Sequence, residues 1–200
     1  MAAPCHVSLR RPPSSGRPNA ATHRHDAETN QGILMGHLSL AALSVLDAGP
    51  LGQVRAAHSA GFSHVGPRLQ PLLATDAITI GDVAAQDALL ELLAQTGVQV
   101  LEIGVFPLRP DSDVEAWGPT LAFSHRIGAR YVVCPVEDTD PVRRLKTFRD
   151  MCDLAETCAL EALIEFNPYS GCRTLEEAAA LVAAAERDNA KQIGRASCRE

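Results

Sequence analysis

The stretch Gly128-Ala-Arg-Tyr-Val-Val-Cys134 decides the fold prediction, because it places a glycine directly before a short apolar segment. The same arrangement occurs in Gly61-Phe-Ser-His-Val-Gly66 and in Gly97-Val-Gln-Val-Leu-Glu-Ile-Gly104. A glycine just past a helix can adopt the left-handed conformation that closes the last turn. The three glycines are 36 and 31 positions apart (97 − 61 and 128 − 97), and one βα unit takes roughly 30 residues. The spacing predicts repeated units of helix, glycine and strand.

Working outward from these units, we expect five strands and five helices in alternation. The strands are nearly continuously apolar, as in parallel strands that helices cover, and we expect them near 37–41, 62–66, 98–105, 130–135 and 161–166. Helices are expected near 50–60, 82–96, 112–127, 140–158 and 174–187. Asp140 before Pro141 predicts one helix start. Capping boxes are predicted for Ser112 with Glu115 and for Thr174 with Glu177.

This alternation predicts an α/β fold with a parallel sheet, but it does not separate a barrel from an open doubly wound sheet. Neither GxGxxG nor GxxxxGK[ST] follows the first expected strand, so the nucleotide-binding form lacks its usual support.

Composition restricts the classes of partner. The 200 residues carry a net charge of −6 with 46% hydrophobic residues, which suits one globular domain. No apolar run reaches the roughly 18 residues typical of a membrane span, and an acidic balance argues against nucleic-acid partners. The six cysteines form no CxxC pair, so we expect reduced thiols in a cytoplasmic protein. They are Cys5, Cys134, Cys152, Cys158, Cys172 and Cys198.

The two ends of the chain differ from the middle. Residues 1–34 are rich in Pro, Ser, Arg and His without periodicity, so we expect a disordered, non-native extension, with Met35 as the start of the folded protein. Residues 192–200 include Ile193-Gly-Arg-Ala-Ser-Cys-Arg-Glu200, which looks like a translated sequencing adapter and is set aside. The partial barrel is therefore predicted over residues 35–191, with a natural sequence that continues elsewhere.

Candidate site residues are sought at the carboxyl ends of the strands, where α/β folds bind ligands. Glu165 is a carboxylate inside an otherwise apolar strand, and burying it without a partner would cost several kcal/mol. A metal ion or a catalytic role would explain it, and so would a salt bridge across a barrel interior.

Three further residues are predicted to contact substrate. Glu102 alternates with Ile103 in the third strand, so it faces either the site or a helix. Arg109 follows in the next loop and can clamp an anion or a hydroxyl group. Asn167 comes just after Glu165. The charges that follow the fourth strand are expected to be solvated or, for Asp140, to cap a helix. His37, His58, His64 and His125 lack metal-ligand spacing.

Four stretches resemble sugar phosphate isomerase/epimerase proteins, which are xylose isomerase-like TIM barrels. The first three are His37-Leu-Ser-Leu-Ala-Ala-Leu-Ser-Val-Leu-Asp47, Ala60-Gly-Phe-Ser-His-Val-Gly66 and Val100-Leu-Glu-Ile-Gly-Val-Phe-Pro-Leu-Arg109. The fourth and best match is Leu163-Ile-Glu-Phe-Asn-Pro-Tyr-Ser-Gly171, followed by Arg173-Thr-Leu-Glu-Glu177. The resemblance covers residues 35–190 and implies the N-terminal part of a (β/α)₈ barrel, with about five βα units.

The resemblance also implies a site. The family holds a divalent ion (Mn, Mg, Co or Zn) with Glu, Asp, His and Glu, and Glu165 matches the first ligand. The other three would come from strands six to eight. Carboxylates, including the one at Glu165, would move a proton alpha to a carbonyl through an enediolate, which a hard cation stabilises. Gly104 departs from the glutamate that similar members carry, and Glu102 is not expected to replace that contact.

The expected function is therefore metal-dependent isomerisation or epimerisation of a sugar or polyol. Dehydratases of inosose or dehydroshikimate share the barrel and stay open as an alternative, as does a non-catalytic fragment. Apurinic endonucleases are disfavoured, because Gly66-Pro67 and Phe106-Pro107 stand where they place histidines. We expect the 200-residue chain to be inactive alone, and to form a homo-oligomer through open sheet edges.

Overall fold

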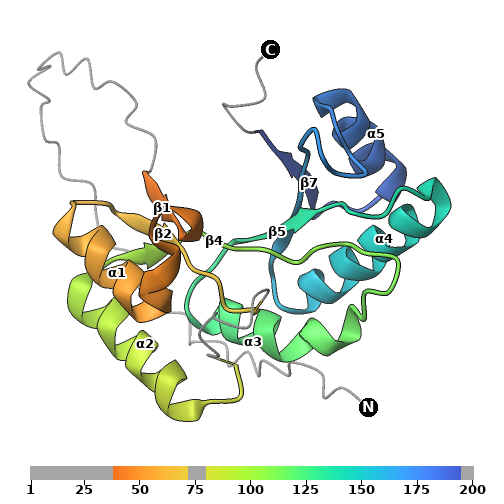
Figure 1. Cartoon of the computed structure of the whole chain (residues 1–200). Coiled ribbons are helices and arrows are strands. Elements are labelled where there is room, and N and C mark those ends of the chain that lie inside the picture. Colours follow the sequence, from red (N-terminus) through yellow and green to blue (C-terminus); the bar gives the residue numbers. More distant parts are fainter. Residues whose placement is uncertain (1–37, 72–79, 195–200) are drawn as a thin grey trace, which may run out of the picture.

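The computed structural model describes residues 38–71 and 80–194, which form an arc of parallel strands with helices on its outer side (Figure 1). The strands are β1 (Ser39–Ala41), β2 (His64–Gly66), β3 (Gln99–Val100), β4 (Glu102–Ile103), β5 (Tyr131–Pro135), β6 (Glu161–Glu165) and β7 (Ala190–Ile193). The helices are α1 (Gly49–Ser59), α2 (Val83–Thr96), α3 (Gly118–Arg126), α4 (Pro141–Thr157) and α5 (Leu175–Ala185). Two 3-10 helices, η1 (Ala42–Ala48) and η2 (Glu115–Trp117), precede α1 and α3.

All strand pairs are parallel, in the orders β1-β2-β3 and β4-β5-β6-β7. Leu101 joins the two groups, since it lies between β3 and β4 and bonds to both sides. Its N–H donates to the carbonyl of Val65, and its carbonyl accepts from the N–H groups of Arg130 and Tyr131. The seven segments thus occupy six successive strand positions, and the five βα units predicted from the sequence are confirmed.

The core lies between the strands and the outer helices. Val65, Val132 and Ile164 are fully buried there, against helix residues such as Phe148. Because side chains alternate along a strand, the residues between them face the opposite side, which is the interior of the barrel. Glu161 and Glu165 belong to that inner face of β6, and both are half-buried.

The predicted glycine turns are confirmed. Gly61, Gly97 and Gly128 have φ angles of 78°, 70° and 83°, which lie in the left-handed region that favours glycine. Each glycine ends the turn between a helix and the next strand, so each fixes where that strand begins.

Two of the three predicted helix starts are confirmed. Asp140 caps α4 by accepting from the N–H groups of Val142 and Arg143, and the hydroxyl of Thr174 caps α5 by accepting from the N–H of Glu177. The capping box predicted at Ser112 is wrong.

The Ser112 hydroxyl instead closes a turn. It accepts from the N–H of Arg109 and donates to the carbonyl of Pro107, and α3 begins only at Gly118, with a proline in its first turn. The predicted helix over 112–127 therefore starts six residues too early.

Other differences from the prediction concern an additional strand and the ends of the expected segments. β7 was not among the expected strands, and it pairs with β6 through Ile193, so Gln192 and Ile193 belong to the sheet. The expected strand 98–105 is shorter, ending at Ile103. The predicted extension at residues 1–34, His37 and residues 195–200 lie outside the described residues. Within the described ranges, no helix has the length and apolar character to cross a bilayer.

Candidate functional site

Glu165 is the last residue of β6, so the structure places it at the carboxyl end of the sheet. Its register neighbours are Pro135 at the end of β5 and Ile193 at the end of β7. The side chain is half-buried and lies on the inner face, opposite to Ile164, which is fully buried in the core. This is the end and the face that the sequence predicted for a functional carboxylate.

Asn167 shapes the loop that follows Glu165. Its side-chain oxygen accepts from the N–H of Tyr169 at 3.0 Å, and its backbone carbonyl accepts from the N–H and the hydroxyl of Ser170. The N–H of Asn167 donates to the carbonyl of Cys172 at 3.1 Å. Asn167 thus closes a tight turn directly after β6.

This loop is joined to the loop between β5 and α4. The N–H of Gly171 donates to the carbonyl of Val136, and the carbonyl of Gly171 accepts from the Arg144 guanidinium. A Cβ added at Gly171 would collide with the backbone carbonyl of Asp138. The two loops beside Glu165 are therefore in backbone contact, which only glycine permits at this position.

Asp138 and Glu137 are adjacent but differ in environment. Asp138 is 1% exposed and binds Arg143 with both oxygens, at 2.5 and 2.8 Å. The hydrogen bonds from Arg143 hold the pKa of Asp138 below its usual value. The expectation of a solvated charge is wrong for Asp138, because the guanidinium and the Asp140 N–H satisfy its carboxylate inside the protein.

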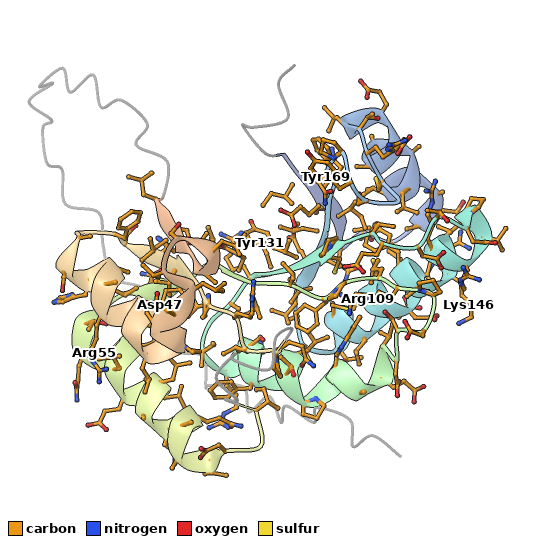
Figure 2. All side chains as sticks on the ribbon, viewed as in Figure 1. Asp47, Arg55, Arg109, Tyr131, Lys146 and Tyr169 are labelled. Atoms are coloured by element: carbon orange, nitrogen blue, oxygen red, sulfur yellow. The ribbon has the colours of Figure 1, made fainter. Side chains whose placement is uncertain are left out.

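Glu137 pairs with Arg109, one of the predicted substrate-contact residues. Arg109 binds it through Nε at 2.6 Å and Nη2 at 3.2 Å, and both side chains are about half exposed. The hydrogen bonds that Arg109 donates to Glu137 raise the pKa of the guanidinium. The pair lies beyond the ends of β4 and β5, where Leu108 bridges to Val136. Figure 2 shows Arg109 on the segment that leads from β4 to α3.

Glu102 lies in a different part of the inner face. The hydroxyl of Ser39 donates to both of its oxygens, at 3.3 and 3.2 Å, and Gly66 leaves the space that the carboxylate fills. Burial raises the pKa of Glu102. By register, Glu102 aligns with Tyr131 and Glu161, the first residues of β5 and β6, whereas Glu165 is the last residue of β6.

The structure therefore brings Glu165, Asn167 and the Arg109–Glu137 pair to the carboxyl-end loops, and it leaves Glu102 deeper along the strands. Sequence reasoning missed Ser39 as the partner of Glu102. The available signal was its phase, because Ser39 precedes Leu40, which packs against the core, by one position in β1.

The described side chains do not form a complete metal site. In residues 38–71 and 80–194, no three His, Cys, Asp or Glu side chains are grouped closely enough to hold a metal ion. Glu165 would be one ligand of such a site, and the described residues do not complete it.

The described cysteines have no sign of nucleophilic or ligand function. Four are buried thiols outside any disulfide, as expected from the sequence, and Cys5 and Cys198 lie outside the described residues. Burial raises the thiol pKa to about 12 for Cys152 and to about 11 for Cys172, and raises it well above the usual value for Cys134. A thiol with a raised pKa is protonated at neutral pH and reacts slowly.

Comparison with known proteins identifies the fold. No protein-family model and no curated protein sequence matches the chain. Solved structures do match, including D-psicose 3-epimerase with D-tagatose from Clostridium cellulolyticum H10 (14% identity, TM-score 0.62, 77% of this chain and 61% of that chain). A xylose isomerase domain protein from Alicyclobacillus acidocaldarius matches at 15% identity and TM-score 0.60, over 78% and 61% of the two chains.

A third match is the IolI protein with a binding zinc atom, at 17% identity and TM-score 0.61, over 76% of this chain and 60% of that chain. These likenesses define the class: the chain has the fold of a xylose isomerase-like TIM barrel, as the sequence resemblance implied. It spans about 60% of the length of these three structures, and its described strands occupy six successive positions of a parallel sheet.

Proposed function

We propose that this sequence forms part of a sugar isomerase or epimerase, in which Glu165 transfers a proton at the carbon next to a carbonyl group. The supporting observation is the position of Glu165, a half-buried carboxylate on the inner face at the carboxyl end of β6. Active sites of (β/α)₈ barrels lie at that end. Epimerases are among the structures that share this fold.

The proposed step uses one carboxylate of this chain. Glu165 takes the proton from the carbon alpha to the carbonyl, and the electron pair of that C–H bond moves to the carbonyl oxygen, giving an enediolate. Return of a proton to the opposite face of the same carbon gives an epimer, and return to the neighbouring carbon gives an isomer. A carboxylate can act as this base when it is held within hydrogen-bond distance of the proton.

Other residues would bind and orient the sugar. Asn167 would offer its side-chain nitrogen from a loop that is held by hydrogen bonds among its own residues. Arg109 keeps its guanidinium oriented through Glu137, so its remaining donors can meet a hydroxyl group. Glu102 would accept from a hydroxyl group that reaches deeper into the barrel. The substrate class that fits these groups is a keto-sugar or a related polyol.

A divalent ion, Mn, Mg, Co or Zn, would polarise the carbonyl and hydroxyl oxygens of such a substrate. Glu165 is the ligand that this chain would contribute, and the complete barrel would supply the other three. The four buried free thiols support a reducing location, for which we propose the cytoplasm.

The test is solvent proton exchange in a chain that carries this sequence within a complete barrel. Ketohexoses would be incubated in D₂O, and deuterium at the carbon alpha to the carbonyl would be followed by proton NMR. Glu165→Gln should slow incorporation at least a hundredfold, because general-base catalysis contributes about that much. The matched control is Glu161→Gln, on the same face of the same strand but at its amino end.

The proposal predicts that Glu161→Gln exchanges at the wild-type rate and that a chelator stops the wild-type reaction. The 200-residue chain alone should show no turnover, because it contributes a single metal ligand. Undiminished exchange in the Glu165→Gln protein would refute the assignment of Glu165.

A further inference from the structure

A hollow in the surface lies beside the loop that follows Glu165. It is lined by Thr139 from the β5–α4 loop, by Pro168, Tyr169, Ser170 and Gly171, and by Arg173 and Glu177 at the start of α5. Its volume is about 400 Å³. None of these residues was a site candidate in the sequence, apart from the capping role of Glu177.

Tyr169 stands at the edge of this hollow with its side chain 99% exposed. Figure 2 shows it on the loop between β6 and α5, well apart from Tyr131. A single exposed aromatic residue is ordinary on a protein surface. Here the ring borders a concave surface that also contains charged and hydroxyl groups, and that combination is typical of a ligand site.

Hydrogen bonds hold the backbone of the loop that presents Tyr169. The Tyr169 N–H is bound by Asn167, and the Ser170 hydroxyl bonds to the backbone of Cys172. The carbonyl of Pro168 accepts from Arg173 Nε at 3.3 Å. A loop that is already ordered loses less conformational entropy on ligand binding than a loop that the ligand must first order.

The charged groups of the hollow supply both donors and acceptors. The Glu177 carboxylate accepts from the N–H of Arg173 through Oε2, at 2.7 Å. Among the residues that the structure describes, the terminal nitrogens of Arg173 donate to no other group. Because the Glu177 carboxylate lies beside the Arg173 guanidinium, the hollow disfavours a purely anionic ligand such as phosphate, which Glu177 would repel. They suit a neutral ligand whose hydroxyl groups both donate and accept hydrogen bonds.

We propose that this hollow binds a sugar ring, with the apolar face of the ring against Tyr169 and its hydroxyl groups on Arg173, Glu177 and Thr139. The loop that lines it directly follows Glu165, so a ring bound here would be the neighbour of the unit that lies at Glu165. The natural substrate is therefore a glycoside or oligosaccharide, whose reacting unit lies at Glu165 and whose second ring lies here. The substrate assignment rests on the proposed function, whereas binding of a ring at Tyr169 does not.

The test uses the 200-residue chain with 3-fluorotyrosine in place of tyrosine. The sequence has two tyrosines, so the ¹⁹F spectrum has two signals, and loss of one signal in Tyr169→Phe assigns them. Methyl β-D-glucopyranoside is the probe, because it has no free carbonyl and cannot react at Glu165. Mannitol at equal concentration controls for a general effect of polyols.

The proposal predicts that the glucoside shifts the Tyr169 signal in a saturable way, that the Tyr131 signal stays in place, and that mannitol has no effect. By ligand-observed NMR, Tyr169→Ala and Arg173→Ala should each weaken binding about tenfold, as expected for loss of one aromatic or bidentate contact. Tyr169→Phe should keep most of the affinity, since it keeps the ring.

The proposal is overturned if the Tyr169 signal does not respond, whether or not Tyr131 does, or if Tyr169→Ala binds as well as wild type. A response at Tyr131 alone would place the sugar on the inner face of the barrel. The proposed function would then stand without this second site. Conversely, a response at Tyr169 combined with wild-type proton exchange in Glu165→Gln would keep the sugar site and remove the proposed reaction.

Discussion

Glu102 and Glu165 lie on the same inner face of the arc, but the two carboxylates have different surroundings. Glu102 fills a space that Gly66 leaves for it, and Ser39 bonds to both of its oxygens. Glu165 stands at the open end of β6, between two loops that are fixed to each other. Glu102 therefore lies level with the first residues of β5 and β6, whereas Glu165 lies at the carboxyl end of β6, beside two loops whose backbones are in contact. A reaction site needs a carboxylate whose surroundings hold it in one geometry, so we propose that the function lies at the carboxyl end of the strands.

The largest effect is expected when the β5–α4 loop and the loop that follows β6 are pushed apart. Gly171→Ala would press a methyl group against the backbone of Asp138, which cannot move aside as a side chain can. We expect the free energy of unfolding to fall by about 3 kcal/mol, the upper range for forced overpacking. Chemical denaturation would measure the loss.

Gly118→Ala is the matched control, because nothing lies within 4 Å of a Cβ at that position in α3. It should leave stability unchanged or raise it by up to about 1 kcal/mol, as alanine favours helix over glycine. Equal effects of the two substitutions would show that the loops are not in the contact described.

A smaller loss of stability is expected when the two neighbouring acids of the β5–α4 loop, Glu137 and Asp138, are replaced one at a time. Asp138→Ala removes a buried carboxylate that binds Arg143 and the Asp140 N–H, and should lower stability by about 2 kcal/mol at pH 7. Glu137→Ala removes only an exposed partner of Arg109 and should change stability by less than about 1 kcal/mol.

The pH dependence of Asp138 follows from the direction of its pKa. Because the folded protein lowers that pKa, the carboxylate stabilises the fold above the unfolded value of about 4 and loses this effect as the pH falls through the folded value. The difference between wild type and Asp138→Ala should therefore shrink below pH 4. A difference that stays constant down to pH 2 would contradict the assignment.

The smallest effect is expected at Glu102, and it has the opposite sign. Burial raises the pKa of this carboxyl group, so its ionised form destabilises the fold above the folded pKa, and this penalty disappears as the pH falls. Glu102→Gln should raise the melting temperature at pH 7 to 8 by a few degrees, with no gain near pH 4.

Much of this architecture could be predicted from local sequence signals. Glycines after helices marked three strands, and the caps at Asp140 and Thr174 marked two helices, because each signal acts within a few residues. Glu165 could be chosen as a candidate site residue because a carboxylate is costly to bury inside an otherwise apolar strand. The missed strand β7 has no such signal, since Lys191 and Gln192 are exposed at the edge of the sheet.

The contacts that distinguish the two regions could not be predicted in this way. Ser39 and Glu102 are far apart in sequence and meet only because their strands belong to one arc. Glu137 and Asp138 are neighbouring acids whose different burial depends on Arg143 and on the approach of Gly171. At Ser112 the capping signature was present, but the hydroxyl was used to close the preceding turn instead.

The most direct test of the central claim is anomalous diffraction from crystals of a complete-barrel chain containing this sequence, grown with Mn²⁺. The account predicts a manganese peak at the carboxyl end of the strands, with a Glu165 oxygen at roughly 2.0–2.6 Å, the range for carboxylate ligands of hard cations. It also predicts that Glu102 remains bound to Ser39 and away from the ion. A manganese ion held without Glu165, or held by Glu102 in its place, would contradict the account.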